Sequence, residues 1–312
     1  MRRKSGRLNL GPVVSVATKE FPDHRGEGMK HGIDDHMLVN RTLVRIVGMS
    51  RSGNHAIINW MLEQLSGRWC FLNCAEPGTN PFHTARMTDE GRCYRSNDPE
   101  FDLEAHRSGQ LSGKDCLVVS HEDTFLKPAF GPDATARQPA WVGQAQRRLD
   151  VIILRDPYNL FASRRRFDHQ AFSDRIMVRM WKQHARAFLG DRRAVAGPVL
   201  GVSYNAWVSD RRYRAAIAGK LGLDFTDAGF HDIARCGGGS SFDGYRFDGQ
   251  AGRMNLFERW QHYREDRQFR ALFDADTRAF ASRIFGPPPQ DLAGGHRSHG
   301  TCLHPLAAEG GA

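Results

Sequence analysis

The chain alternates short, nearly continuous apolar segments with longer segments in which apolar residues recur every three or four positions. Five of the short segments have the length and content of buried strands: residues 43–47, 69–72, 116–119, 151–154 and 199–202. Parallel strands read as continuous apolar runs, because helices cover both of their faces. The pattern therefore predicts an α/β fold, a three-layer αβα arrangement around a mostly parallel central sheet.

Two helices are predicted directly after strands. Residues 56–65 carry an apolar stripe at helical spacing, and Gly67 lies just beyond the predicted end. The second helix should begin at Asp156 and Pro157, because Asp is a favourable N-cap and Pro is favoured at the first helical position.

The ends of the chain differ in composition from its middle. The apolar segment near the N-terminus is short and interrupted, so residues 1–36 are predicted to be a flexible extension. An amphipathic pattern begins at "FERWQHYREDRQFRALF" and continues to Phe285, where Gly286 and three prolines stop it. We therefore expect one domain over residues 37–286 and a disordered tail over residues 287–312.

Composition narrows the function classes. The 312-residue chain is 40% hydrophobic and 25% charged, as in soluble globular proteins, and its net charge of +9 favours anionic partners. The six cysteines form no C-x-x-C pair, which favours reduced thiols and a cytoplasmic protein without a metal site. There is no run of about 18 apolar residues, so no transmembrane segment is expected.

The first predicted strand leads into a glycine-bounded loop. In "VGMSRSGNHA", Gly48 and Gly53 keep the G-x-x-x-x-G spacing of a phosphate-binding loop. A strand, a tight loop and a helix N-terminus place several backbone N–H groups around one point, which favours an anion. The Lys and Ser/Thr of a nucleoside triphosphate site are replaced by Asn54 and His55, which argues against ATP or GTP hydrolysis. An ordinary strand-to-helix turn remains the alternative.

A second segment, "VIILRDPYNLFASRRRF", places Arg155 at the end of a predicted strand and Ser163 about two turns into the following helix. Ligands bind at the carboxyl ends of parallel strands, so these two residues could hold a second anionic group near the first loop. The alternative is a capped helix with a solvated basic face.

Together, the two segments resemble the sulfotransferase family that uses 3′-phosphoadenosine 5′-phosphosulfate (PAPS). That family carries a K/R-S-G-T-T loop for the 5′-phosphosulfate, matched here by Arg51, Ser52, Gly53, Asn54 and His55. Its R-D/N-P…S segment for the 3′-phosphate is matched by Arg155, Asp156, Pro157 and Ser163. The resemblance implies a P-loop-like 5′-phosphosulfate loop, PAPS as co-substrate and no metal requirement. Asn54 and His55 depart from the two hydroxyl residues of the family, although both can donate hydrogen bonds to phosphate.

The segment "CLVVSHEDTF" is similar to the strand whose end supplies the catalytic base in this family. It offers both His121 and Glu122. We prefer His121, because an imidazole has an ordinary pKa of about 6.5, whereas Glu122 would need desolvation to become a base near neutral pH. A shift of one residue along the strand decides which side chain faces the site. Arg51 is the candidate that neutralises the leaving phosphate oxygen.

Further matches are less specific. "VLGVSYNAWVSD" resembles the segment in which a tyrosine contacts the adenosine, which implies Tyr204. "CGGGSSFDG" resembles a mobile loop that closes on the 3′-phosphate, which implies Gly238, Ser240 and Ser241 as contacts.

The predicted function is transfer of a sulfuryl group from PAPS to a hydroxyl or amine of an acceptor, a glycan or a small metabolite. The polar insertions at residues 76–113 and 124–146 should form the acceptor site, and no residue pattern specifies the acceptor or an oligomeric state. One rival is a kinase or GTPase-like protein on the related P-loop fold. The other is a non-enzymatic polyanion-binding protein, suggested by the arginines at 164–166, 192–193 and 211–214. Aromatic residues near these arginines are too scattered for a stacking platform, so no specific nucleic-acid partner is expected.

Overall fold

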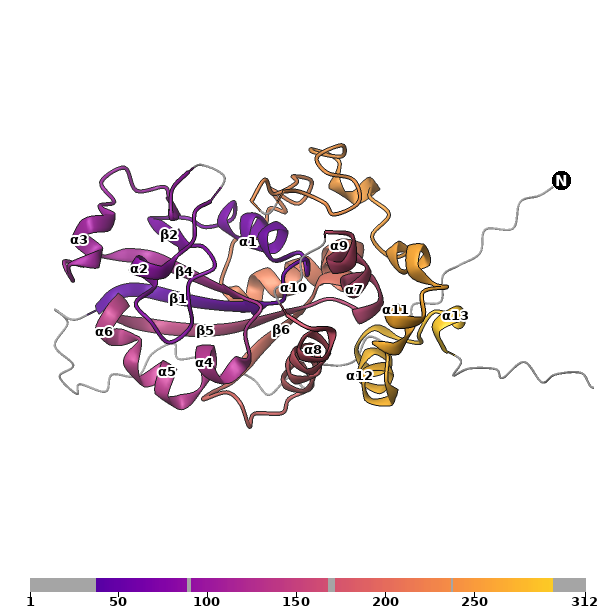
Figure 1. Cartoon of the computed structure of the whole chain (residues 1–312). Coiled ribbons are helices and arrows are strands. Elements are labelled where there is room, and N and C mark those ends of the chain that lie inside the picture. The colour runs from indigo at the N-terminus through magenta and orange to yellow at the C-terminus, as the bar shows by residue number, and fades with distance from the viewer. Residues whose placement is uncertain (1–37, 89–90, 168–171, 237, 294–312) are drawn as a thin grey trace, which may run out of the picture.

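A computed structural model describes residues 38–88, 91–167, 172–236 and 238–293. A six-stranded sheet forms its centre, in the order β3-β2-β4-β1-β5-β6 (Figure 1). All neighbouring strands are parallel except β3, which runs antiparallel to β2 at the sheet edge. The strands are β1 Leu38–Gly48, β2 Trp69–Leu72, β3 Tyr94–Ser96, β4 Lys114–Glu122, β5 Gln144–Leu154 and β6 Val199–Ser203. The predicted α/β class with a mostly parallel sheet is confirmed.

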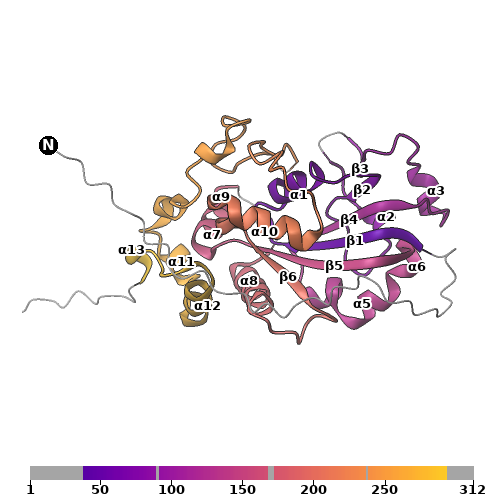
Figure 2. The ribbon, with the colours of Figure 1, turned by 180° about the vertical axis from the view of Figure 1, so that it is seen from behind.

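Helices cover both faces of the sheet (Figures 1 and 2). One face carries α1 Asn54–Leu62, α9 Tyr204–Ser209 and α10 Arg211–Leu221. The other carries α4 Leu126–Phe130, α5 Pro132–Arg137, α6 Pro139–Val142 and α8 Asp174–Phe188. The remaining helices are α2 Pro81–Thr84, α3 Leu103–Arg107, α7 Pro157–Arg166, α11 Arg267–Ala271, α12 Ala275–Phe285 and α13 Gln290–Ala293. None of the helices in the described ranges combines the length and the apolar character needed to cross a bilayer.

Strand β1 lies between β4 and β5 and is buried on both faces. Val44 and Ile46 pack in the apolar cluster that includes α1 and α10, whereas Leu43 and Val47 belong to clusters on the opposite face. This alternation follows from the strand period of two, and it explains why the segment reads as one apolar run.

Arg45 is the polar exception in β1. Its guanidinium is almost fully buried and donates to the Asp150 carboxylate on the neighbouring strand β5, at 2.7 Å from Nε and 2.6 Å from Nη2. A third donor, Nη1, reaches the Ala129 carbonyl at 3.1 Å. A buried charge is tolerated only when its hydrogen bonds are made, and this bidentate pair satisfies both partners.

The five predicted strands are all present, and β1, β4 and β5 begin earlier than their apolar runs indicated. The helix at Pro157 is also present, with the Asp156 carboxylate capping the Asn159 N–H at 2.8 Å. The amphipathic pattern expected to continue to Phe285 is instead broken into a 3-10 helix at Arg259–Tyr263, α11 and α12. Residues 1–36 and 294–312 lie outside the described residues, and α13 falls within the stretch expected to be a tail.

Candidate functional site

The carboxyl ends of the parallel strands open into a cavity of about 790 Å³. Many of the site residues expected from the sequence line it: Arg51, Gly53, Asn54, His55, Glu122, Arg155, Tyr204 and Ser240. The other expected residues have different positions, which are described below. The structure therefore brings together segments that are up to about two hundred positions apart in the chain.

The loop between β1 and α1 has a left-handed backbone at two positions, Arg51 (φ 72°) and Gly53 (φ 84°). A Cβ at Gly53 would lie 2.1 Å from the Tyr204 ring, so only glycine fits at this point. The Ser52 N–H donates a hydrogen bond within the turn, to the Met49 carbonyl at 3.0 Å, and the Ser52 side chain is buried. The first-turn N–H groups of α1 have no intrahelical acceptor, an arrangement that favours an anion at this point.

An ion pair that the sequence analysis did not single out fixes the loop. The Asp123 carboxylate accepts from the Ser50 N–H at 2.9 Å and from Arg164 Nη1 at 2.6 Å. Arg164 also donates to the Ser50 carbonyl at 3.1 Å. Because Asp123 follows β4 and Arg164 lies on α7, this pair ties the loop to two neighbouring elements.

Arg155 is buried at the end of β5 without an ion pair to a carboxylate among the described residues. Its donors go to neutral oxygens instead: the Arg51 carbonyl at 3.1 Å, Ser163 Oγ at 3.1 Å and the Leu256 carbonyl at 2.9 Å. Burial lowers the pKa of Arg155. A desolvated guanidinium of this kind favours an anionic ligand, which would supply the missing charge.

Arg259 is a second buried guanidinium at the same place, and the sequence analysis did not identify it. It donates to Ser163 Oγ at 3.1 Å and to Ser240 Oγ at 2.7 Å, and it lies 3.2 Å from the Asp243 carboxylate. Burial, and then the positive charge of Arg155, lower the pKa of Arg259 to about 10. Ser163 is fully buried between the two arginines and positions them, rather than lining the cavity itself.

Arg51 connects the loop to residues 238–241. Its Nε donates to Ser241 Oγ and its Nη2 to the Gly239 carbonyl, both at 2.6 Å, and its guanidinium stacks over the Phe167 ring at 4.5 Å. Burial and the nearby charge of Arg155 lower the pKa of Arg51. Thus Ser241 contacts Arg51, Ser240 lines the cavity, and Gly238 packs near Phe167 without lining it.

The two candidate bases point to opposite sides of the sheet. Glu122 lines the cavity, where its carboxylate accepts from Asn54 Nδ2 at 2.7 Å and lies 3.9 Å from His55 Nδ1. His121 instead lines a small hollow beside Arg45, and its Nδ1–H donates to the Ala75 carbonyl at 2.7 Å. Burial lowers the pKa of His121 to about 4. Strand alternation therefore turns the His121 side chain away from the cavity and the Glu122 side chain toward it.

Asn54 and His55, the residues that depart from the sulfotransferase loop, have specific partners. Asn54 Nδ2 also donates to the Met49 carbonyl at 3.1 Å, and its side chain occupies the space that a Cβ on Gly48 would fill. His55 Nε2 lies 2.9 Å from Asn73 Oδ1. Burial lowers the pKa of His55, but hydrogen bonds to Cys236 and Asn73 and the charge of Glu122 outweigh it and raise the value to about 9.

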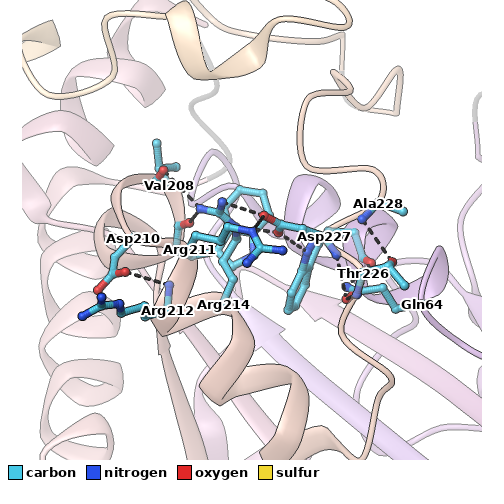
Figure 3. Close-up of polar contacts among 11 residues, drawn as sticks. Gln64, Val208, Asp210, Arg211, Arg212, Arg214, Thr226, Asp227 and Ala228 are labelled. Carbon is cyan, nitrogen blue, oxygen red and sulfur yellow. Dashed lines mark hydrogen bonds and ion pairs between the residues drawn. The ribbon is translucent and has the colours of Figure 1, made fainter.

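An apolar wall closes the other side of the cavity. The Tyr204 and Trp207 rings stack with centroids 6.0 Å apart, and Phe230 packs edge-on against Trp207. Arg214 holds this wall in place: it donates to the Trp207 carbonyl at 2.7 Å and lies 3.6 Å from the centre of the Phe230 ring. The same guanidinium pairs with Asp227 at 2.7 Å, as Figure 3 shows.

Comparison with known proteins gives matches to solved structures alone. No family model and no curated protein matches the chain. The sulfotransferase domain of an olefin synthase from Synechococcus PCC 7002 is 16% identical, with a TM-score of 0.42, over 85% of this chain and 100% of that domain. Mouse sulfotransferase SULT7A1, in complex with PAP, is 14% identical, with a TM-score of 0.40, over 80% of this chain and 92% of that one. Both are sulfotransferases.

Proposed function

We propose that the protein is a PAPS-dependent sulfotransferase and that Glu122 is its catalytic base. One observation carries the proposal: Arg51, Arg155 and Arg259 are gathered at the N-terminus of α1, on the same cavity as Glu122. Burying three like charges together is unfavourable. The Asp243 carboxylate lies beside Arg259, and an anionic ligand would add further compensating charge. A donor with two separate phosphate groups fits a site with several such cations.

Different regions of the cavity would hold the different parts of this donor. The 3′-phosphate would bind to Arg155, Arg259 and Ser240. Each charge-assisted hydrogen bond to it would contribute about 1.5–3 kcal/mol to the binding free energy. The first-turn N–H groups of α1, with Arg51, would hold the 5′-phosphosulfate. The adenosine would lie along the aromatic wall at Tyr204, in the role expected from the sequence.

The proposed reaction is a direct transfer. Glu122 removes the proton of the acceptor hydroxyl, and the acceptor oxygen bonds to sulfur as the bond between sulfur and the 5′-phosphate oxygen breaks. The products are the sulfate ester and adenosine 3′,5′-bisphosphate, whose new phosphate charge is neutralised by Arg51 and the loop N–H groups. Asn54, through its 2.7 Å hydrogen bond, keeps the Glu122 carboxylate turned into the cavity.

The rival functions receive less support from the site. Arg164 and Arg214, which belong to the clusters that suggested a polyanion-binding protein, are buried in ion pairs with Asp123 and Asp227. Such arginines stabilise the fold and are not available to a nucleic-acid backbone. For a triphosphate enzyme, the loop lacks the lysine that contacts the β- and γ-phosphates, and the Asn54 amide is already engaged with Glu122.

Calorimetric titration with adenosine 3′,5′-bisphosphate in the presence of EDTA tests the donor site. We expect tight binding without magnesium, and a loss of at least about tenfold in affinity for Arg155→Met, since one charge-assisted contact is removed. Arg193→Met is the matched control, because Arg193 is exposed and pairs with the neighbouring Asp191. The assignment would be overturned if the unmodified protein, Arg155→Met and Arg193→Met bound the bisphosphate with equal affinity. Magnesium-dependent binding of ATP would also overturn it. A panel of polysaccharide, lipid and phenolic acceptors with radiolabelled PAPS would then identify the acceptor class.

A further inference from the structure

His55 is a cavity residue to which the proposed transfer assigns no role. It lies in the first turn of α1, beside Asn54, and lines the same cavity as Glu122. An imidazole can carry a positive charge, which the hydroxyl groups of the sulfotransferase loop cannot. The contacts of the two ring nitrogens show which form the His55 imidazole takes.

The Nε2 atom of His55 faces an amide oxygen. Asn73 Nδ2 donates to Cys236 Sγ at 3.3 Å, which turns the oxygen of the same amide toward the imidazole. Asn73 Oδ1 lies 2.9 Å from His55 Nε2. Because an amide oxygen accepts hydrogen bonds and donates none, Nε2 carries a hydrogen.

The other ring nitrogen, Nδ1, faces a carboxylate. It lies 3.9 Å from Glu122 Oε1, a distance at which opposite charges attract strongly in a partly buried site. With Nε2 protonated, a hydrogen on Nδ1 makes the ring an imidazolium, and the carboxylate favours that charge. Burial lowers the pKa of His55, but hydrogen bonds to Cys236 and Asn73 and the charge of Glu122 outweigh it and raise the pKa to about 9. The ring is therefore a cation at neutral pH.

The two carboxylate oxygens of Glu122 have different surroundings. Oε1 accepts from Asn54 Nδ2 at 2.7 Å and is also the oxygen that faces the His55 ring. Within the described part of the chain, no side chain donates a hydrogen bond to Oε2. One oxygen is thus held from the α1 side, and the other is left for a ligand in the cavity that Glu122 lines.

We propose that the His55 imidazolium and the Asn54 amide hold Glu122 by Oε1, so that Oε2 is the atom that takes the acceptor proton. This inference rests on the proposed function. The acceptor proton moves to Oε2 as the acceptor oxygen bonds to sulfur and the bond between sulfur and the 5′-phosphate oxygen breaks. His55 keeps both of its ring protons throughout, so it is a positioning residue and not a second base.

The charge on His55 gives this arrangement an upper pH limit. The titratable groups that face the ring are Glu122 on β4 and Cys236 in the segment after α10, and the charge of Arg51 acts on Glu122 from the loop. As pH rises through about 9, the ring loses its charge and its attraction for Oε1, so transfer should decrease there. Arg259, whose pKa burial lowers to about 10, would account for a separate decrease at higher pH.

The first experiment reads the charge on His55 and needs no acceptor. The histidine ring signals of the ¹⁵N-labelled full chain are followed by NMR from about pH 6 to 10, and the signal absent from His55→Gln is assigned to His55. We expect this signal to titrate near pH 9. In Glu122→Gln its midpoint should fall toward the ordinary value of about 6.5, because the negative partner is gone. A neutral ring at neutral pH, or a midpoint that is the same in Glu122→Gln, overturns the ion pair.

The second experiment measures radiolabelled sulfate transfer from PAPS to an acceptor that the unmodified protein uses. His55→Gln should lower kcat about tenfold, leave the KM for the acceptor within about twofold and abolish the decrease near pH 9. His55→Lys restores a positive charge and should be at least about threefold faster than His55→Gln. The control is His83→Gln, which changes an exposed histidine of α2 outside the cavity and should behave as the unmodified protein does.

Two results of the transfer assay would overturn the proposal. One is a His55→Gln variant with the kcat and pH profile of the unmodified protein, and the other is an equal loss of kcat in His55→Lys and His55→Gln. If the unmodified protein neither binds the bisphosphate nor transfers sulfate to any acceptor, the proposed function is wrong, and the NMR titration still decides whether His55 and Glu122 form an ion pair.

Discussion

Substitution of Glu122 by an uncharged residue tests which of the two candidates on β4, His121 or Glu122, is the catalytic base. Glu122→Gln keeps the shape of the side chain and an oxygen that can accept from Asn54 Nδ2, which now lies 2.7 Å from the carboxylate. It removes the group that takes the acceptor proton, so sulfate transfer should fall about 10²- to 10⁴-fold, equivalent to about 3–5 kcal/mol of transition-state stabilisation. Bisphosphate affinity should stay within about threefold or increase slightly, because a negative charge is removed from beside an anion site.

His121→Ala is the matched variant one position away. It removes the donor to the Ala75 carbonyl and leaves that buried oxygen and a small void, so the free energy of unfolding should fall by about 2–4 kcal/mol. Transfer by the folded fraction should stay within about threefold. The assays are radiolabelled sulfate transfer from PAPS to an acceptor that the unmodified protein uses, calorimetry with the bisphosphate, and urea unfolding. The reasoning is refuted if His121→Ala abolishes transfer at unchanged stability while Glu122→Gln remains active.

Three further outcomes follow from the buried polar groups. Burial lowers the pKa of His121 to about 4, and it does the same for His184, a buried residue of α8 whose Nε2 lies 2.9 Å from the Thr124 carbonyl. The ordinary pKa in the unfolded chain is about 6.5, so the unfolded state takes up these protons first. The free energy of unfolding should therefore fall as pH decreases from about 6.5 to 4, by about 3 kcal/mol for each imidazole, measured by urea unfolding across that range. Ser163→Ala should weaken bisphosphate binding about tenfold by calorimetry, because two guanidinium groups lose their shared acceptor, and an unchanged affinity would exclude this positioning role. Arg214→Met should lower the free energy of unfolding by about 3–5 kcal/mol, since it leaves the Asp227 carboxylate without its main partner. The control is Arg193→Met, which changes an exposed arginine and should leave the urea midpoint unchanged.

The fold was predictable because its strands carry their signal locally. Each of the five predicted strands contains a short, nearly continuous apolar run, and Asp156 with Pro157 marks the start of α7 within two residues. Strand β3 escaped prediction because it is three residues long, half-buried and antiparallel at the sheet edge. The C-terminal helices could not be told apart in the sequence, because one amphipathic pattern continues through Asp266 and Asp274. The side chains of these two residues cap the starts of α11 and α12.

The candidate site was predictable only in part, because its geometry depends on distant contacts. The loop at Arg51 and the strand end at Arg155 could be found from their position relative to apolar runs. The choice between His121 and Glu122 depends on the face to which each side chain points, and neighbouring residues of one strand give no local signal for it. Arg259 lies 96 positions after Ser163, with which it forms a hydrogen bond, and its segment resembles an ordinary amphipathic helix.

The contacts of Arg51 with residues 238–241 span 188 and 190 positions. During synthesis the ribosome therefore releases the whole central sheet before Arg259, the last cation of the proposed anion site, exists. A nucleotide in the cell cannot assist the early folding of the nascent chain through a site that is still incomplete, so the sheet must reach its topology on the strength of its own apolar packing. If the proposed site binds its nucleotide, we expect ligand stabilisation to begin only after the segment around Arg259 has joined the sheet.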